Sequence, residues 1–258
     1  MAPTGLAVIG MSKPKPAPRS RQKRRAKAAR AAAPAVLRRG DPDAGEHRLS
    51  RALWLAQTLR QRIISGFYRP GERIREAELR AEFGFSNGPI RQALQTVVAD
   101  GLAERAPWQS LRIKLLNQEQ IVELFQVRSA LLEYAAELAA RNASPDALEN
   151  AAALKRSIDE GLSKIKAGAG HPSFNGQLSQ WLLAAAGNEV LRDIWDKTMQ
   201  QTLIYVNASL MRGQGTKSRV LIHKLVDRIC GGDIAQARAA ARELTRQTLV
   251  DLGIDGTV

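Results

Sequence analysis

The sequence predicts a mainly α-helical chain with one small β-hairpin in its first half. Apolar residues recur at helical spacing over most of residues 50–252. Two short segments that favour β-structure, Leu102–Arg105 and Leu111–Leu115, interrupt the helices. A length of 258 residues fits one large domain or two modest ones, at about 100–200 residues per domain.

Positive charge is concentrated in the first 50 residues. The chain has a formal net charge of +14, and residues 1–50 hold 12 Lys and Arg against three acidic residues. Because this segment lacks apolar periodicity, residues 1–47 are predicted to be a disordered basic tail. Two interpretations stay open: the tail is solvated and keeps the chain soluble, or it is a basic arm that binds nucleic-acid phosphates without reading the sequence. Met11 is an alternative start that leaves the basic block intact.

The composition excludes several classes of protein. The single cysteine, Cys230, excludes an internal disulfide framework and a Cys-based zinc site, and predicts a reducing, cytoplasmic location. No apolar stretch reaches the roughly 18 residues of a membrane span. A pI of about 10.6 makes a polyanion the first candidate partner. We find no nucleophile–base order and no phosphate-binding glycine loop, so the chain is not expected to be an enzyme.

Residues 48–116 predict a small helical module that ends in the hairpin. Its expected helices are Ser50–Gly66, Glu76–Phe83 and Asn87–Ala99. A turn at Tyr68–Gly71 follows the first helix. Gly84 is placed to end the second helix and Ser86 to cap the third. This order is that of a winged helix-turn-helix, whose third helix enters the DNA major groove, although a three-helix module without a DNA partner has the same pattern.

Residues 117–252 predict a second, all-helical domain. Its expected helices are Gln118–Asn142, Pro145–Lys166, Ser173–Ala186, Glu189–Met211, Thr216–Ile229 and Ile234–Leu252. Ser144 and Pro145 supply an N-cap and a first-turn proline. Six helices of these lengths predict a compact antiparallel bundle.

Short motifs across residues 50–252 resemble those of a known family. They are Gly66–Gly71, Glu76–Leu79 and Gly84–Leu94 with Gly101-Leu102, and, in the second domain, Val127–Glu133, Ala185–Asn188 and Gly232-Asp233. The first set resembles the GntR superfamily of bacterial transcription regulators, and the second resembles its FadR-type ligand-binding (FCD) domain. The resemblance implies a homodimer that binds double-stranded operator DNA as a repressor or an activator, with repression favoured, under control of a small-molecule effector.

Charge and this resemblance together give the candidate DNA contacts. They are Arg73, Arg75, Ser86, Asn87, Gly88, Pro89, Arg91, Gln109, Ser110 and Arg112. Asn87 stands where the family usually has Arg, Gly88 where it has Thr, and Ser110 where it has a wing-tip Gly. Loss of an Arg contact costs about 1–3 kcal/mol of discrimination, although Asn87 has the groups to read an adenine. We therefore expect an altered operator, with the basic tail supplying phosphate affinity.

The metal site of many FCD domains is not expected in this chain. The resemblance places the four ligand positions at Asn175, Ser179, Ile222 and Leu244. Neutral oxygens are weak ligands and aliphatic side chains have no lone pair, so neither a metal nor another cofactor is predicted. His223 lies one residue beyond the third position and points about 100° away around the helix.

Arg128 is the candidate effector anchor. It shares a helical face with apolar residues, where an unpaired charge is costly. It is expected either to pair with Glu133 or another acid, or to bind a carboxylate or phosphate of the effector, an organic acid or acyl thioester. Asn175 and Ser179 share a face and are expected to hydrogen-bond the same ligand. The alternative is a constitutive DNA-binding dimer whose effector domain no longer senses anything.

Overall fold

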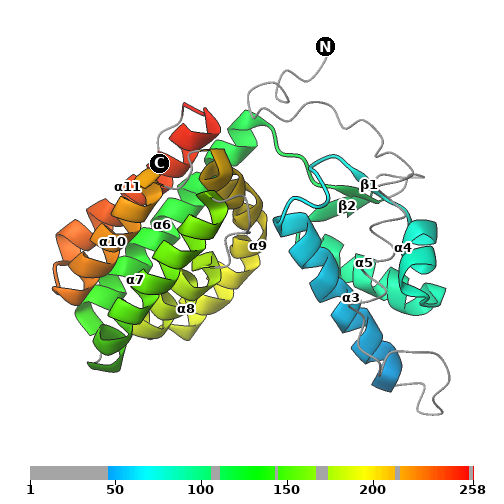
Figure 1. The fold of residues 1–258 in the computed structure, drawn as a ribbon, viewed down its shortest axis with the longest axis horizontal. Coiled ribbons are helices and arrows are strands. Elements are labelled where there is room, and N and C mark those ends of the chain that lie inside the picture. The colour runs from blue at the N-terminus through cyan, green and yellow to red at the C-terminus, as the bar shows by residue number, and fades with distance from the viewer. Residues whose placement is uncertain (1–45, 106–110, 143–144, 167–173, 213–215, 256–257) are drawn as a thin grey trace. The chain divides into compact units, whose positions relative to one another are not determined.

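The computed structural model describes residues 46–105, 111–142, 145–166, 174–212, 216–255 and 258 (Figure 1). The chain divides into two compact units, an N-terminal unit that ends at Leu115 and a helical unit that begins at Leu116. Most of the predicted basic tail lies outside the described residues. Its last two positions, Glu46 and His47, belong to the first described helix, so helix begins slightly earlier than expected.

The N-terminal unit has the predicted order of elements. Its elements are α3 (Glu46–Ile64), β1 (Arg73–Ile74), α4 (Glu76–Phe83), α5 (Asn87–Ala99), β2 (Ala103–Arg105) and β3 (Leu111–Ile113). Helix α5 packs against α3, with Leu55, Leu59, Ile90 and Leu94 fully buried. These apolar residues recur every three or four positions, so each helix presents one continuous apolar face to the other.

A three-stranded antiparallel sheet of order β1-β3-β2 completes this unit. The hairpin of β2 and β3 is confirmed, with shorter strands than expected. Strand β1 was not predicted; it pairs Arg73 with Arg112 and Ile74 with Leu111. A two-residue strand has no pattern of its own, because only its hydrogen bonds to β3 define it.

The six predicted helices of the second unit are confirmed to within one residue. They are α6 (Gln118–Asn142), α7 (Pro145–Lys166), α8 (Phe174–Ala186), α9 (Glu189–Arg212), α10 (Thr216–Cys230) and α11 (Ile234–Leu252). The position expected for the cap of α7, Ser144, lies outside the described residues. Helix α6 is central and packs against α8, α9, α10 and α11.

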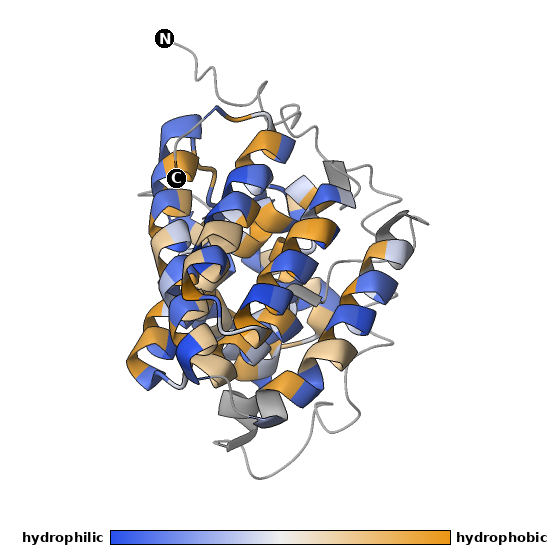
Figure 2. Cartoon of the chain, turned by 90° about the vertical axis from the view of Figure 1, so that its left-hand side faces the viewer, coloured by the Kyte–Doolittle hydropathy of each residue, from blue (hydrophilic) through white to orange (hydrophobic). Residues whose placement is uncertain are grey.

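The core of the helical unit is made by amphipathic helices. Figure 2 shows hydrophobic and hydrophilic residues on opposite sides of the same helices. The core includes Trp195, Ile158, Leu182 and Leu225, each at most 1% exposed. Among the described residues, no helix is both long enough and apolar enough to cross a membrane.

Candidate nucleic-acid interface and effector cavity

A three-residue turn joins α4 to α5. Gly84 ends α4 in the left-handed conformation, with φ of 69°, and its N–H donates to the carbonyl of Arg80 at 2.9 Å. A side chain at this position would be strained, so the predicted role of Gly84 is confirmed. Ser86 occupies the N-cap position of α5, but its hydroxyl accepts no capping hydrogen bond. Two short helices joined by such a turn form a helix-turn-helix.

One face of α5 carries exposed side chains. This face includes Asn87, Gly88 and Arg91, three of the residues predicted to contact DNA, and all three are exposed. Ser86, which directly precedes the helix, is also exposed. Gln92 and Gln95 are exposed as well, and sequence reasoning missed them. Gln92 lies four residues after Gly88, and Gln95 lies four residues after Arg91. Residues three or four positions apart share a face of a helix, so this spacing could have placed both glutamines on the predicted DNA-binding face. Glutamine side chains suit base edges, notably adenine.

Pro89 does not share that face. Its ring is buried, together with Ile90 and Ala93. The side chain of Pro89 is therefore not exposed to a ligand, and its place among the DNA contacts stays a prediction. Because a proline at the third helical position lacks only an N–H that has no intrahelical partner, it fits the first turn without loss of a hydrogen bond.

Carboxylates neutralise several of the arginines around α5. Arg75 Nη1 donates to Glu78 Oε1 at 3.0 Å, and Arg91 Nε donates to Glu76 Oε2 at 3.3 Å. Arg105 also lies near Glu76, with an N–O distance of 3.9 Å. Such exposed pairs are weak, so a phosphate can replace the carboxylate at low cost.

Arg80 differs from these arginines in its partner. Its Nη1 donates to the side-chain oxygen of Asn87 at 2.8 Å, so that the end of α4 is tied to the first residue of α5. Both side chains are exposed. The amide of Asn87 is neutral, and it therefore leaves the charge of Arg80 uncompensated. This pair joins positions seven residues apart in different elements, and no sequence pattern signals it.

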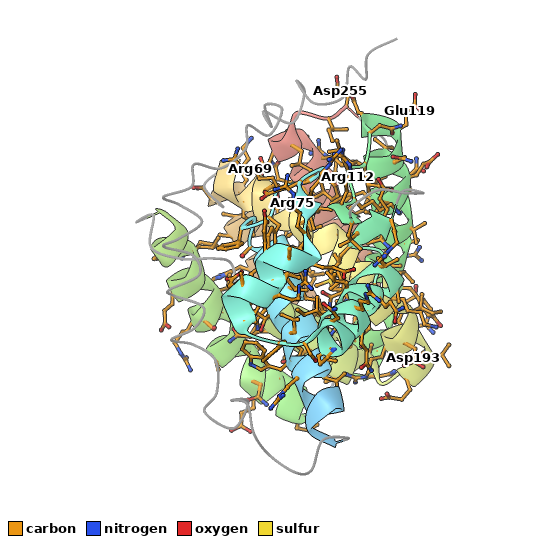
Figure 3. The ribbon with its side chains drawn as sticks, turned by 90° about the vertical axis from the view of Figure 1, so that its right-hand side faces the viewer. Arg69, Arg75, Arg112, Glu119, Asp193 and Asp255 are labelled. Carbon is orange, nitrogen blue, oxygen red and sulfur yellow. The ribbon has the colours of Figure 1, made fainter. Side chains whose placement is uncertain are left out.

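The sheet adds two further cations. Arg73 and Arg112 face each other across β1 and β3, and Glu104 faces Arg112 from β2. The guanidinium of Arg112 donates to the carbonyl of Gly71 at 3.3 Å. Figure 3 labels Arg112 together with Arg69 and Arg75 among the side chains of this unit. The two remaining predicted contacts, Gln109 and Ser110, lie outside the described residues.

The helical unit contains a small cavity of about 60 Å³. Its lining includes Arg128, Ser179, Ile222 and Leu244, so the structure brings together the predicted anchor and three of the four family ligand positions. The rest of the lining is Phe125, Leu132, Leu178, Leu182, Trp195, Met199, Leu203, Val206, Ser209, Leu210, Ser218, Thr245 and Thr248. The side chain of Asn175, the fourth of these positions, lies outside the part of the chain that the structure describes.

Arg128 is buried at this cavity, and no carboxylate of the described residues forms an ion pair with it. It is 9% exposed, and its Nη1 has no hydrogen-bond partner among the described residues. Its guanidinium carbon lies 3.4 Å from the centre of the Trp195 ring, and the indole Nε1 of Trp195 also lacks a partner there. Burial lowers the pKa of Arg128 to about 9, so the side chain remains charged at neutral pH.

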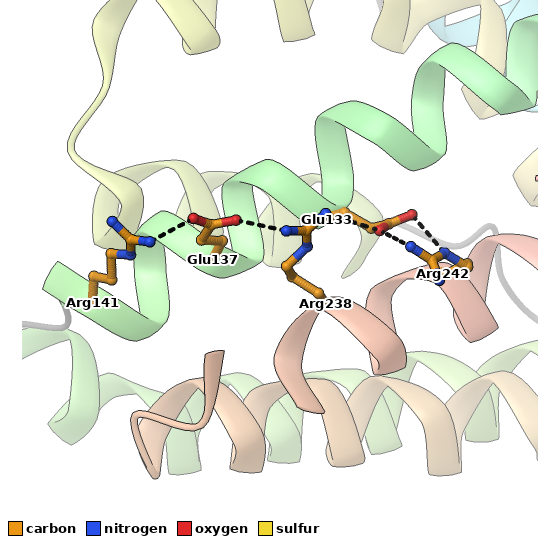
Figure 4. Close-up of polar contacts among 5 residues, drawn as sticks. All are labelled: Glu133, Glu137, Arg141, Arg238 and Arg242. Atoms are coloured by element: carbon orange, nitrogen blue, oxygen red, sulfur yellow. Dashed lines mark hydrogen bonds and ion pairs between the residues drawn. The ribbon is translucent and has the colours of Figure 1, made fainter. Parts of the chain in front are cut away.

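The expected ion pair between Arg128 and Glu133 is wrong. Glu133 instead accepts two hydrogen bonds from Arg242 on α11, at 2.6 and 3.0 Å. Arg238 and Arg141 donate to Glu137 one turn further along α6 (Figure 4). Residues five apart on a helix point about 140° away from each other, which is why Arg128 and Glu133 face different neighbours.

The cavity offers no ligand set for a metal ion. Ile222 and Leu244 line it with aliphatic groups, whereas His223 is directed elsewhere, with Nε2 3.0 Å from Oδ1 of Asp159 on α7. Arg219 donates to the same carboxylate and lowers the pKa of Asp159. Within the described segments, no group of three His, Cys, Asp or Glu side chains is placed to hold a metal.

Comparison with known proteins agrees with both units. The sequence profile of the bacterial regulatory proteins of the gntR family matches residues 52–113, and that of the FCD domain matches residues 123–247. The chain belongs to the GntR family. It carries a GntR-type helix-turn-helix followed by an FCD domain, and the curated proteins that match it are named as transcriptional regulators or repressors.

Curated GntR relatives are similar over part of their length. YdhC of Bacillus subtilis, an uncharacterized HTH-type transcriptional regulator, is 33% identical over 90 residues, which cover 35% of this chain and 40% of YdhC. A probable D-xylose utilization operon transcriptional repressor of Paenarthrobacter nicotinovorans is 34% identical over 103 residues, 39% of this chain and 46% of the relative. The chain therefore spans less than half the length of these curated relatives.

Solved structures share the fold of this GntR protein. McbR/YncC of E. coli has a TM-score of 0.65 at 19% identity, covering 78% of this chain and 96% of that one. A putative transcriptional regulator from Rhodococcus sp. RHA1 has a TM-score of 0.66 at 20% identity, covering 78% and 98%. At these identities the likeness concerns the fold alone.

Proposed function

We propose that this GntR protein is a cytoplasmic repressor that binds a small organic anion in the cavity of its helical unit, without a metal ion, and thereby changes its affinity for operator DNA. The observation that carries the proposal is the pair of buried donors in the cavity, Arg128 Nη1 and Trp195 Nε1, neither of which has a partner among the described residues. Leaving a buried donor unpaired costs about 1–3 kcal/mol, and more when it is charged. A bound anion would remove this cost.

The residues that line the cavity indicate which charge and which polar groups the anion has. Arg128 is the sole charged residue of the lining, which favours a single negative charge on the ligand. The hydroxyls of Ser209, Thr245 and Thr248 donate to carbonyls of their own helices, so their oxygens remain available as acceptors. Acceptors suit hydroxyl groups on the ligand. A short hydroxycarboxylic acid meets both requirements, and the small volume disfavours an acyl thioester.

Support for dimerisation comes from an apolar row on α6. Val127 and Tyr134 are 52% and 47% exposed, and Leu131 lies half-buried between them. Apolar residues at alternating spacings of four and three are typical of the face along which two helices pack against each other. We propose that a second copy covers this row, so that two α5 helices meet two half-sites. Val127→Glu is expected to yield monomers by light scattering; a dimer that persists would place the interface elsewhere.

A genome-wide map of bound DNA tests the regulatory role. The full chain should occupy a small set of promoter sites that share one inverted motif. Binding to such sites in vitro should then weaken when the effector is added. A uniform distribution along the genome would favour the alternative, a constitutive DNA-binding dimer, which the small size of the cavity also supports.

Thermal unfolding tests the sensor. Glycolate, lactate, glycerate and gluconate should raise the melting temperature of the full chain, since a ligand that binds only the folded state stabilises it by about 2.7 kcal/mol at 100 times its Kd. Gluconate is included because a relative 34% identical over 87 residues is the gluconate operon transcriptional repressor of Bacillus licheniformis. Glycerol is the uncharged control, and acetyl-CoA represents the thioesters. No shift with any acid would contradict the proposal.

A further inference from the structure

The contact between Arg80 and Asn87 combines two features that matter for base recognition. Arg80 lies in the last turn of α4, and Asn87 is the first residue of α5. The N-terminal residues of a recognition helix are those that reach base edges in the major groove. The hydrogen bond of 2.8 Å between the two side chains therefore places a guanidinium at the reading end of α5, although Arg80 belongs to the preceding helix.

The charge of Arg80 is more available than that of its neighbours. Arg75, Arg91 and Arg105 each lie within 4.0 Å of a carboxylate of Glu76 or Glu78, whereas Arg80 has a neutral amide as partner. A guanidinium has five N–H donors, and one nitrogen of Arg80 is engaged here. Since the side chain is exposed, the remaining donors face solvent in the free protein.

The hydrogen bond also determines what Asn87 presents. Its side-chain oxygen accepts from Arg80, so its amide N–H₂ remains to face a ligand. Bidentate recognition of adenine requires both the oxygen and the nitrogen of the amide, and here one of the two lone pairs of the oxygen already accepts from Arg80. Arg80 and Asn87 together thus present mainly donors, namely the remaining guanidinium N–H groups and the amide N–H₂. Guanine is the base whose major-groove edge offers two acceptors, O6 and N7.

We propose that Arg80 and Asn87 act as one reading unit that selects guanine at the operator position facing the start of α5. The proposal rests on the function proposed above, because it assigns a specificity to the same DNA-binding surface. It assigns guanine, where the sequence alone suggested adenine, as the base that Asn87 helps to read. It also adds Arg80, which was absent from the predicted contacts, to the residues that determine specificity.

Selection from a random duplex library tests the proposal. The wild-type chain, Arg80→Gln, Asn87→Ala and the double variant are each used to select DNA at one ionic strength, and the bound pools are sequenced. Arg69→Gln is the matched control, because it removes an exposed charge that lies outside α4 and α5. Circular dichroism confirms that each variant is folded.

We expect Arg80→Gln and Asn87→Ala to lose the same guanine preference, by about tenfold or more at one base position. The double variant should lose no more than the stronger single variant, since the two side chains bind the same base. The control should keep the wild-type motif. A uniform fall in affinity with an unchanged motif would show that Arg80 contacts phosphate only, and would overturn the proposal. A wild-type chain that enriches no motif would instead contradict the proposed function itself.

Discussion

The guanidinium carbon of Arg128 lies 3.4 Å from the centre of the Trp195 ring, deep in the helical unit. Stacking of this kind contributes up to about 2 kcal/mol when the pair is desolvated. Burial of one ion costs several kcal/mol even after the protein relaxes. The stack therefore offsets only part of the cost, and Nη1 of Arg128 has no hydrogen-bond partner among the described residues.

Replacing this cation by an apolar side chain should stabilise the empty protein. We expect Arg128→Met to leave the free energy of unfolding unchanged or to raise it by about 1–4 kcal/mol, the range seen when buried ion pairs are replaced by apolar groups. The same variant should lose the thermal shift caused by organic acids. Arg246→Met, which removes an exposed charge from α11, is the control and should keep that shift. An Arg128→Met variant that still responds to the acids would rule out Arg128 as the anchor.

Tyr205 should contribute to stability in a pH-dependent manner. Its hydroxyl oxygen accepts from the N–H of Leu116 at 3.3 Å, and burial raises the pKa of Tyr205 from 10.0 to about 12. Between these values the unfolded chain loses its proton first, so the wild type should lose stability as the pH rises from 10 to 12. Tyr205→Phe should cost about 1 kcal/mol at neutral pH and reduce the alkaline loss.

Urea unfolding at pH 7, 10 and 11 measures both effects of Tyr205→Phe. Tyr134→Phe is the control, because Tyr134 is exposed in a single copy and Phe keeps the ring of the proposed dimer row; it should leave the profile unchanged. Equal alkaline slopes for wild type and Tyr205→Phe would show that other groups cause the loss.

The ion pairs between α6 and α11 should be unequal in importance. Glu133 is 7% exposed, and Arg242 is its two-bonded partner, whereas Arg238 lies 3.8 Å from it. Arg242→Ala leaves a buried carboxylate with weak compensation, so its melting temperature should fall more than that of Arg238→Ala. Adding Glu133→Gln to Arg242→Ala should recover part of the loss. Equal effects of the two arginine variants would contradict this assignment.

The basic tail should change the salt dependence of DNA binding. If residues 1–45 bind phosphates, deleting them reduces the slope of log K against log salt by about 0.9 for each phosphate that the tail neutralises. The deletion stops before α3, so every helix and strand described for the N-terminal unit is kept. Titration of operator binding with both chains gives the two slopes, and equal slopes would leave the tail without a role on DNA.

Metal analysis should find no stoichiometric divalent ion in the purified protein. Ile222 and Leu244 line the cavity where metal-binding relatives need nitrogen ligands, and neither side chain has a lone pair. A chelator should therefore leave the melting temperature unchanged. One equivalent of zinc or manganese whose removal also lowers stability would overturn this prediction.

Local signals in the sequence were sufficient for most of the fold. The limits of α4 and α5 follow from Gly84, Ser86 and the apolar spacing of Ile90 and Leu94, all of which act within a few residues. Strand β1 was not predicted, because its two residues are defined as a strand only by their pairing with β3.

The site was less predictable, because its decisive contacts join distant segments. The sequence identified Arg128 as a buried cation, but it did not show that α11 supplies Arg242 to Glu133 or that α9 supplies Trp195 to Arg128. The bond from Arg80 to Asn87 likewise depends on how the turn at Gly84 orients two helices. Residue types at these positions are compatible with several partners, and three-dimensional packing selects among them.

If Arg128 binds the proposed anion, its buried charge would link the lifetime of the protein in the cell to the supply of that anion. Copies without the anion would then open more often, and proteolysis of opened chains follows their population. Copies filled by an anion are protected by the binding free energy. Scarcity of the metabolite would then lower the number of regulator molecules as well as the loading of each one, and the two effects would act on the same promoter.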